Sequence, residues 1–417
     1  MSPRSIIRGY YAFQLFFSLL IWIPVFYEFQ VRLGMPAEEI FGIQSIYYVV
    51  FCFLEFPTGY FADRYGYKRS LQVASLMLVL GNLMPYGCVY GWISPYAGML
   101  ASYLGIALAR SFSSGATAAY LYEYLKGQGR AAEFKRVEGN ARAYSLVGRT
   151  LVIPFAGLMM NWHLPLPYGI TAVNAVVAGL AASWLPALPV AAPIAGAGPT
   201  AARFSRVTAA WLTLWRTPRL GLIMLQGIAL FLLPRLVQLY LFQPLLQVKG
   251  LKVEVFGAIM SGMMLAEAVG SAQLLRRRQE GPTPVLQSAR ATGTILIYTT
   301  VICFSLVAAA YFEGWRCLAS LGVFSFTVGR AFPIQAQLLN DAIPDSGLRA
   351  SLLSVNAIFE RGGASIVAYL AGQYVAAQAT LGFLAVASLL TWALVLVIGG
   401  TKWRIYDRPL TGGPSMA

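Results

Sequence analysis

Long runs of apolar residues dominate the chain, and short polar segments separate them. Each run has about 20 to 30 residues, enough to cross the roughly 30 Å hydrocarbon core of a bilayer as a helix. Apolar and polar residues do not alternate, as they would in the strands of a membrane barrel, so helices must satisfy the backbone. The pattern predicts an all-α membrane protein with twelve transmembrane helices, in the runs 6–28, 40–61, 71–91, 94–123, 138–161, 167–187, 218–243, 255–275, 288–311, 315–338, 350–374 and 379–400.

A segment that opens with prolines and glycines divides the runs into six and six. We expect one six-helix bundle over residues 1–187, a cytoplasmic linker over 188–217, and a second six-helix bundle with a short tail over 218–417. The second part of the linker combines Trp211 and Trp215 with several arginines. This mixture predicts an amphipathic helix on the inner membrane surface. A plain linker is the alternative.

Composition excludes a soluble protein, because only 11% of the 417 residues are charged and 58% are apolar. The net charge of +15 alone would suggest a nucleic-acid partner. With the N-terminus inside, however, most of the 31 lysines and arginines fall in inner segments, and the outer segments hold only Arg32, Lys249, Lys252 and Arg316. This bias predicts that both termini are cytoplasmic. We therefore expect membrane lipid as a partner and no nucleic acid.

The residues of common catalytic sites are scarce. The chain has one histidine, His163, and four cysteines that lie inside apolar runs and form no CxxC pair. A metal site built on several imidazoles is therefore excluded, and the cysteines are interpreted as packing residues. The sequence also lacks a phosphate-binding GxxxxGK loop and a GxSxG elbow. We predict that the protein is not an enzyme and has no metal or cofactor.

A motif follows the second run. It reads Gly59-Tyr-Phe-Ala-Asp63-Arg64-Tyr-Gly66-Tyr67-Lys68-Arg69 and resembles the signature loop of the major facilitator superfamily, G-x-L-A-D-R-x-G-R-(R/K). Phenylalanine replaces the leucine of this pattern, and Tyr67 replaces its first basic residue. Further stretches resemble a bacterial, efflux-type branch of the superfamily, namely 55–59, 114–123 and 349–354.

The resemblance implies two six-helix bundles around a central cavity, a small-molecule substrate, and a place in the bacterial inner membrane. It also implies that Asp63 lies at a helix N-terminus of the opposite half and closes the cytoplasmic side. Glycines at 59 and 66 would allow a tight turn and a close approach of helices. The gating residues expected are Gly59, Asp63, Arg64, Gly66, Lys68, Glu123 and Arg142. The alternative is a solvated turn with one incidental salt bridge.

Acidic residues inside the runs are candidates for carrying protons. A charge in hydrocarbon costs several kcal/mol, so it usually faces a cavity or a partner. Glu267 is the first candidate, because burial makes a carboxyl group easier to protonate. Glu360 and Glu55 are further candidates. A fixed ion pair with an arginine of a neighbouring helix is the alternative.

Arg235 and Gln238 lie one helical turn apart. A guanidinium beside an amide suits a carboxylate or another oxyanion, so we expect both to contact the substrate. Arg110, Gln14 and Asn356 are further candidates for the cavity wall. The alternative is that Arg235 pairs with Glu267 or Glu360.

These features together predict a secondary transporter that couples protons to the export of a small organic molecule. Arginines outnumber acids within the runs, which favours an anionic or amphiphilic metabolite, siderophore or drug. Pro154 and Gly157 keep part of the antiporter signature of the superfamily, which favours export. An importer or facilitator of an organic anion on the same fold is one alternative. A lipid flippase or a membrane receptor without transport is another.

Overall fold

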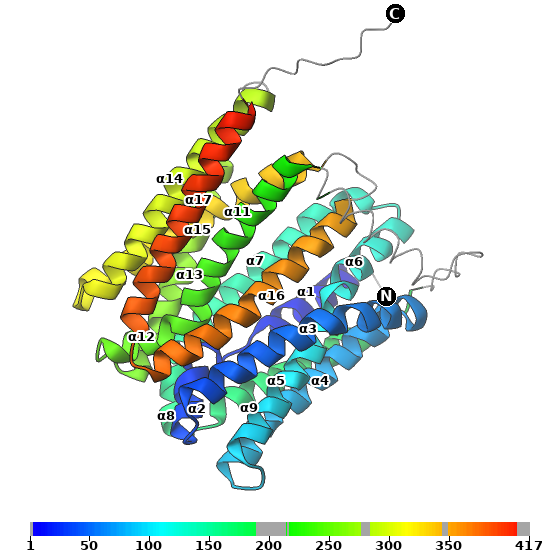
Figure 1. The fold of residues 1–417 in the computed structure, drawn as a ribbon. Helices are drawn as coiled ribbons and strands as arrows, with labels where there is room; N and C mark the ends of the chain where they lie inside the picture. The colour runs from blue at the N-terminus through cyan, green and yellow to red at the C-terminus, as the bar shows by residue number, and fades with distance from the viewer. Residues whose placement is uncertain (1–2, 189–213, 215–216, 277–283, 344–348, 407–417) are drawn as a thin grey trace, which may run out of the picture. The chain divides into compact units, whose positions relative to one another are not determined.

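The computed structural model describes residues 3–188, 214, 217–276, 284–343 and 349–406 (Figure 1). All regular secondary structure in this part of the chain is helical. The described helices belong to two compact units, which we call unit 1 and unit 2. Unit 1 comprises residues 1–193, 239–262 and 364–379, and unit 2 comprises 194–238, 263–363 and 380–417.

Unit 1 contains the helices of the first half of the chain. These are α1 (Pro3–Ser18), η1 (Ile23–Val25), α2 (Phe26–Arg32), α3 (Ala37–Tyr65), α4 (Tyr67–Val89), α5 (Pro95–Ser114), α6 (Ala116–Gly127), η2 (Ala131–Glu133), α7 (Phe134–Val152), η3 (Ile153–Phe155), α8 (Ala156–Trp162) and α9 (Leu166–Trp184). Unit 1 also takes in α12 (Phe242–Val248) from the second half.

Unit 2 contains α11 (Pro218–Arg235), α14 (Pro284–Tyr311), α15 (Gly314–Ala342) and α17 (Thr380–Tyr406). Three second-half elements are divided between the units, namely η4 (Leu236–Leu241), α13 (Val253–Arg276) and α16 (Arg349–Ala376). The predicted division of the chain at residues 188–217 stays a prediction. Its linker and amphipathic helix lie almost entirely outside the described residues, which omit 189–213 and 215–216.

Small residues let the helices of each unit pack closely. In unit 1, α4 packs against both α5 and α9. Gly81 of α4 faces Gly105 of α5, and a Cβ on Gly81 would lie only 2.9 Å from a backbone oxygen of α5. In unit 2, Gly270 of α13 and Gly329 of α15 each face the backbone of the other helix and leave no room for a Cβ. Close backbone approach of this kind is common between helices in membranes.

Several predicted runs are not single helices. The first run breaks after Ser18 and continues through η1, which contains Pro24. The fourth run divides at Gly115 into α5 and α6. The seventh run passes from α11 into a π-helical turn, η4, directly after Pro234. Proline removes a backbone donor and clashes with the preceding turn, which explains the breaks at Pro24 and Pro234.

The structure corrects the predicted turn at Gly59. Helix α3 continues through Gly59 to Tyr65, and α4 begins two residues later. Only Gly66 turns the chain, with φ of 91°, a value that glycine adopts without strain. Most of the motif therefore forms about the last two turns of α3, because the residues around Gly59 continue the i to i+4 hydrogen bonding of this helix.

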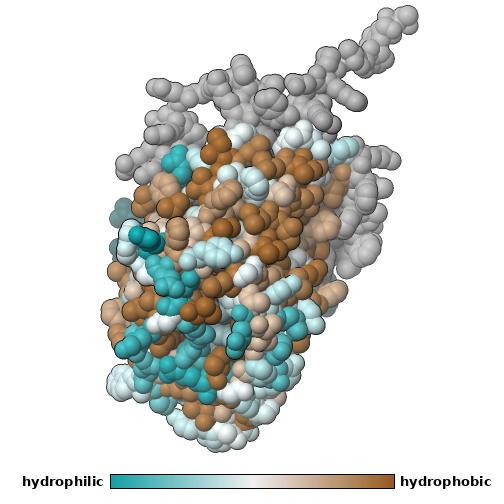
Figure 2. All heavy atoms as spheres, turned by 60° about the vertical axis from the view of Figure 1, so that its left-hand side comes forward, coloured by the Kyte–Doolittle hydropathy of each residue, from teal (hydrophilic) through white to brown (hydrophobic). Residues whose placement is uncertain are grey.

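The prediction of a multi-pass membrane protein is confirmed. Ten helical segments of the described chain are long and apolar enough to cross a membrane. The predicted number of twelve is not confirmed, because α5 and α16 are absent from these ten. Both helices mix polar residues and glycines with their apolar ones. Figure 2 shows hydrophobic residues over much of one face, with hydrophilic residues gathered toward one end of it.

Candidate functional site

A polar cluster lies among the second-half helices of unit 2. Gln238 donates a hydrogen bond from its Nε2 to Oε2 of Glu267 on α13, at 3.1 Å. The two side chains are 29 residues apart in the sequence and both are half-buried. The structure thus joins a predicted substrate contact to a predicted proton carrier.

A second carboxylate belongs to the same group of helices. Asn356 donates from Nδ2 to Oε1 of Glu360, at 2.7 Å within α16. Arg235 of α11 lies close enough to attract the Glu360 carboxylate electrostatically. The Arg235 guanidinium also lies over the Phe231 ring, 5.4 Å from its centroid. Arg235 is thereby held between an aromatic face and a carboxylate.

The local backbone explains how these groups come together. Arg235 ends α11, and Gln238 lies in η4, where the helix widens to π geometry. A π turn adds a residue to the helix and shifts the side chains that follow it, and such turns are frequent at functional sites. On the other side, the close crossing of Gly329 over the Glu267 backbone fixes the helix that carries this carboxylate.

This arrangement can bind an anion and hold a proton. Arg235 and Gln238 present donors to an oxyanion, while Glu267 and Glu360 each accept a hydrogen bond from an amide. An amide donor to a carboxylate is compatible with either protonation state, because the second oxygen can carry the proton. We name Arg235, Gln238, Glu267, Asn356 and Glu360 the midspan cluster.

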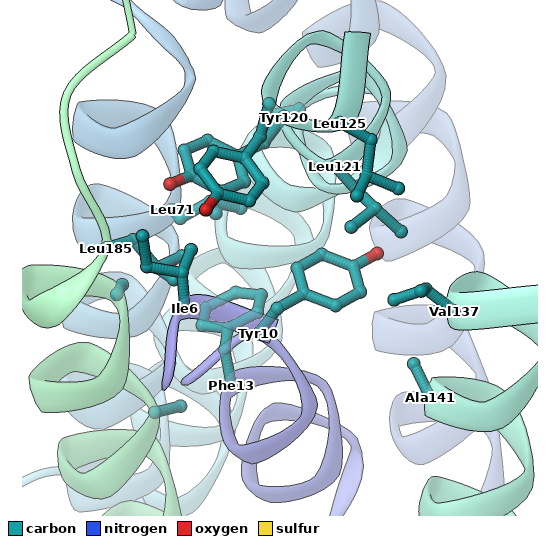
Figure 3. Close-up of a cluster of buried hydrophobic side chains, with 14 of the residues drawn as sticks. Ile6, Tyr10, Phe13, Leu71, Tyr120, Leu121, Leu125, Val137, Ala141 and Leu185 are labelled. Carbon is teal, nitrogen blue, oxygen red and sulfur yellow. The ribbon is translucent and has the colours of Figure 1, made fainter. Parts of the chain in front are cut away.

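A different polar network lies in unit 1, where the apolar cluster of Figure 3 surrounds Tyr10. Figure 3 shows the Tyr10 hydroxyl directed toward the helix that carries Val137 and Ala141. This hydroxyl donates to Oε2 of Glu138 at 2.6 Å and accepts from Nε2 of Gln14 at 3.1 Å.

Arg142 pairs with the same carboxylate, since its Nε lies 2.9 Å from Oε1 of Glu138. Gln14 and Arg142 were predicted as functional residues from the sequence, whereas Glu138 was not. The signal was present, because Glu138 lies four residues before Arg142, the spacing of an ion pair on one helix face. Glu138 is the first residue of the fifth apolar run.

The remaining gate residues lie near helix ends of unit 1. Arg64 donates to the Tyr60 hydroxyl at 2.8 Å. Asp63 and Glu123 are exposed, and Lys68 is half-buried. Glu123 forms no ion pair with the residues that the structure describes. The contact of Asp63 with the opposite half stays a prediction.

Two further candidates also lie in unit 1, away from the midspan cluster in the sequence. Glu55 of α3 accepts a hydrogen bond from Oγ of Ser114, at 3.4 Å. Arg110 lies near the end of α5 and is exposed. Their roles as proton carrier and cavity residue stay predictions.

A buried glutamine that the sequence did not single out joins the two halves of the chain within unit 1. Gln243 of α12 accepts hydrogen bonds through Oε1 from the backbone N–H groups of Tyr27 and Glu28, at 3.0 and 3.1 Å. Its Nε2 donates to the carbonyl of Ile23 at 3.1 Å. Gln243, from the second half of the chain, therefore satisfies backbone donors at the start of α2, a helix of the first half.

A chain of charged and amide side chains lies nearby. Arg32 binds Oε1 of Glu28 at 2.7 Å and Oδ1 of Asn161 at 2.8 Å. Asn161 in turn donates to Oε1 of Glu254, at 2.6 Å. We name Gln243, Glu28, Arg32, Asn161 and Glu254 the outer latch, because the sequence predicts that these helix ends face outward.

Close backbone contacts accompany the outer latch. Gly157 of α8 faces the backbone of Val253, and Gly257 of α13 faces the backbone of Ile153. Neither glycine leaves room for a Cβ. The hydroxyl oxygens of Ser45 on α3 and Ser365 on α16 lie 2.8 Å apart. First-half and second-half helices thus approach each other closely in unit 1.

The profile of the Major Facilitator Superfamily matches residues 9–368 of the chain. No curated protein matches it significantly. Among solved structures, it is similar to the nucleoside transporter NupG, with a TM-score of 0.68, 15% identity, and coverage of 98% of this chain and 100% of that one.

An auto-inhibited peptide transporter of the POT family gives a TM-score of 0.64 at 14% identity, with coverage of 100% of this chain and 99% of that one. A POT family transporter in complex with 5-aminolevulinic acid gives 0.63 at 12% identity, with coverage of 97% and 96%. At these identities the likeness shows the fold alone. The prediction of a transporter rather than an enzyme is confirmed by the family match. The chain, a multi-pass membrane transporter, belongs to the major facilitator superfamily.

Proposed function

We propose that the protein is a proton-coupled exporter of a small anionic or amphiphilic organic molecule, in the inner membrane of a bacterium with both termini in the cytoplasm. The observation that carries this proposal is the midspan cluster. It combines a guanidinium with two carboxylates, each bonded to an amide, and Arg235 and Glu267 lie on helices that are apolar enough to cross a membrane. Charged groups within such helices are costly and usually serve transport.

Arg235 and Gln238 bind an oxyanion of the substrate in this proposal. Export in exchange for protons requires that substrate and proton occupy the cluster in different states of the transport cycle. In this proposal Glu267 takes up its proton after the substrate has left Arg235 and Gln238. Arg235 attracts the Glu360 carboxylate, and this attraction keeps the guanidinium in position.

Alternating access supplies the conformational step. The outer latch holds the outward-facing helix ends of unit 1 together, and it must open for release to the outside. The gate residues around Asp63 close the cytoplasmic side when the outer latch is open, and they separate when the latch is closed. The contacts of Gln243 and Arg32 support this role, because they join segments more than 100 residues apart in the sequence.

Import of an organic anion on the same fold is the second candidate. Its supporting observation is that the fold is shared with nucleoside and peptide transporters. A lipid flippase or a receptor without transport would lack substrate-dependent proton flux altogether. One experiment separates these functions.

The test uses proteoliposomes that contain a trapped pH-sensitive dye, and a panel of small carboxylic acids and amphiphilic drugs as probes. For a probe that exchanges across the membrane, the export proposal requires an outward substrate gradient to drive protons inward. Co-movement of probe and proton in the same direction would support import. Exchange with no proton movement contradicts proton coupling, and binding with no exchange contradicts transport.

The decisive variant is Glu267→Gln. It keeps an acceptor for Gln238 but cannot be deprotonated, so we expect gradient-driven transport to fall by about tenfold or more, equivalent to about 1.4 kcal/mol. Probe exchange without a gradient should persist. Glu39→Gln is the matched control, because Glu39 is an exposed carboxylate at the start of α3. Full gradient-driven transport by Glu267→Gln removes the proposed proton role.

A further inference from the structure

A groove of about 630 Å³ runs along α14 and α15 in unit 2, beside the turn that joins these helices. Its lining is almost entirely hydrocarbon and aromatic, from Val301, Phe304, Phe312, Trp315, Ala319 and Val323. Most of these side chains are exposed, so the groove opens toward the surroundings of unit 2. Phe304 is held in place by an edge contact with Trp392 of α17, with ring centroids 5.4 Å apart.

The two serines of the groove offer it no free donor. Ser305 donates its hydroxyl to the carbonyl of Ile302, and Ser320 donates to the carbonyl of Arg316, both at 2.8 Å. A polar solute would lose its hydration in this groove and gain no hydrogen bond from these hydroxyls. The groove therefore suits a hydrocarbon chain rather than a hydrophilic substrate.

One end of the groove has a different chemistry. Arg316 lies in the first turn of α15 and is exposed, with its guanidinium 5.8 Å from the centroid of the Trp315 ring. Tryptophan with an apolar body and one polar N–H favours the boundary between acyl chains and headgroups. Glu313 lies in the same turn but does not line the groove, so Arg316 is the charged group at its end. The first turn of a helix further favours an anion there.

The length of the groove corresponds to one leaflet. From Trp315 to Val323 the helix rises 1.5 Å per residue, which gives about 12 Å. Half of the roughly 30 Å hydrocarbon core is about 15 Å. An acyl chain whose headgroup meets Arg316 would thus follow the groove for most of one leaflet.

We propose that this groove binds an anionic phospholipid of the adjoining leaflet, with one acyl chain along α14 and α15 and the phosphate at Arg316. The site is distinct in sequence and in chemistry from the midspan cluster, and the proposal does not depend on the transported substrate. The negative headgroup is favoured over a zwitterionic one, because its net charge complements the guanidinium.

The first test measures binding to the delipidated full-length protein in mild detergent. Native mass spectrometry with phosphatidylglycerol and with phosphatidylcholine should give tighter binding of phosphatidylglycerol. Arg316→Gln should weaken phosphatidylglycerol binding by about tenfold, the loss of one charge-assisted contact. Lys252→Gln is the matched control, because Lys252 is an exposed cation outside the groove. Equal affinities for the two lipids, or an unchanged affinity in Arg316→Gln, overturn the headgroup assignment.

The second test locates the acyl chain. Phosphatidylglycerol with brominated acyl chains quenches nearby tryptophans, so one equivalent should quench Trp315. Trp315→Phe should abolish most of this quenching, whereas Trp162→Phe, which removes another exposed tryptophan, should not. Ala319→Phe should fill the groove and prevent lipid retention while leaving the helical circular dichroism unchanged. The same quenching in Trp315→Phe as in the wild type, or full retention in Ala319→Phe, overturns the groove assignment.

Discussion

Tyr10 shows how one polar atom is satisfied inside an apolar cluster. Its side chain is 1% exposed, and its hydroxyl binds Glu138 and Gln14. A buried carboxylate without a donor would carry a full desolvation cost, so the phenol and Arg142 together make Glu138 tolerable at this position. The same side chains therefore serve packing and charge balance at once.

We predict that Tyr10→Phe destabilises the protein by about 1–3 kcal/mol, because it removes the donor from a half-buried carboxylate without leaving a cavity. Unfolding in mixed micelles, followed by circular dichroism, measures the change. Tyr11→Phe is the control, because the Tyr11 ring packs on Tyr144 and its hydroxyl has no hydrogen-bond partner among the described residues. Equal stability of the two variants would show that the bond from Tyr10 to Glu138 contributes nothing.

Residue types could be predicted from the sequence better than their partners. Glu267 and Gln238 stand out because a charge or an amide is rare in an apolar run, yet their hydrogen bond depends on how α13 packs on the π-helical turn. Gln243 lies in an apolar run in the same way as Gln238, but the sequence does not reveal its partners. Its role as a cap for α2 is set by a segment more than 200 residues away. Local sequence contains no information about such a partner.

Helix interruptions decide the geometry at the scale of single elements. Hydrophobic runs predicted most helices, but a run does not reveal a break when the residues on both sides are apolar. A proline such as Pro234 commonly kinks a helix, whereas the π geometry of the following turn depends on packing around it. Gly59 illustrates the opposite error, because a motif glycine was interpreted as a turn although the helix continues through it.

A glycine at a helix crossing holds α8 close to α13. Gly157→Ala would drive a methyl group into the backbone of Val253, so the contact between α8 and α13 must separate. We expect this variant to lose the outer-closed state and most of its transport. The measurement is the labelling by an impermeant maleimide of a single cysteine at Ser365, which is 7% exposed where α16 meets α3, and this labelling should become several-fold faster.

The matched control is Gly262→Ala on α13. No atom lies within 4 Å of a Cβ built at this position, and alanine favours the helix by about 1 kcal/mol relative to glycine. It should therefore leave labelling and transport unchanged. Unaltered labelling in Gly157→Ala would mean that the close crossing does not hold the outer side shut.

At the scale of the whole molecule, the sequence predicted the class of protein because hydropathy and the distribution of lysines and arginines are direct consequences of the bilayer. The sequence could not predict which helices of the second half of the chain pack in unit 1 and which pack in unit 2. Parts of η4, α12, α13 and α16 belong to unit 1, although the chain order assigns them to the second half. The outer latch explains this result, because these segments carry the side chains and glycines that meet α2, α3 and α8.

Alternating access requires that the outer latch, and with it the contact of Ser45 with Ser365, breaks in each cycle, which gives a prediction for the transporter as a whole. Ser45 and Ser365 place their hydroxyl oxygens 2.8 Å apart, and two sulfur atoms at these positions could approach to the roughly 2.05 Å of a disulfide. In a background without the four native cysteines, Ser45→Cys with Ser365→Cys should oxidise readily and lose transport. Reduction should restore transport, and each single variant should transport with or without oxidant.

The disulfide traps one state only if the two helices separate during the cycle. Full transport by the oxidised double variant, with the disulfide verified by mass spectrometry, would therefore exclude an opening of the outer side at α3 and α16.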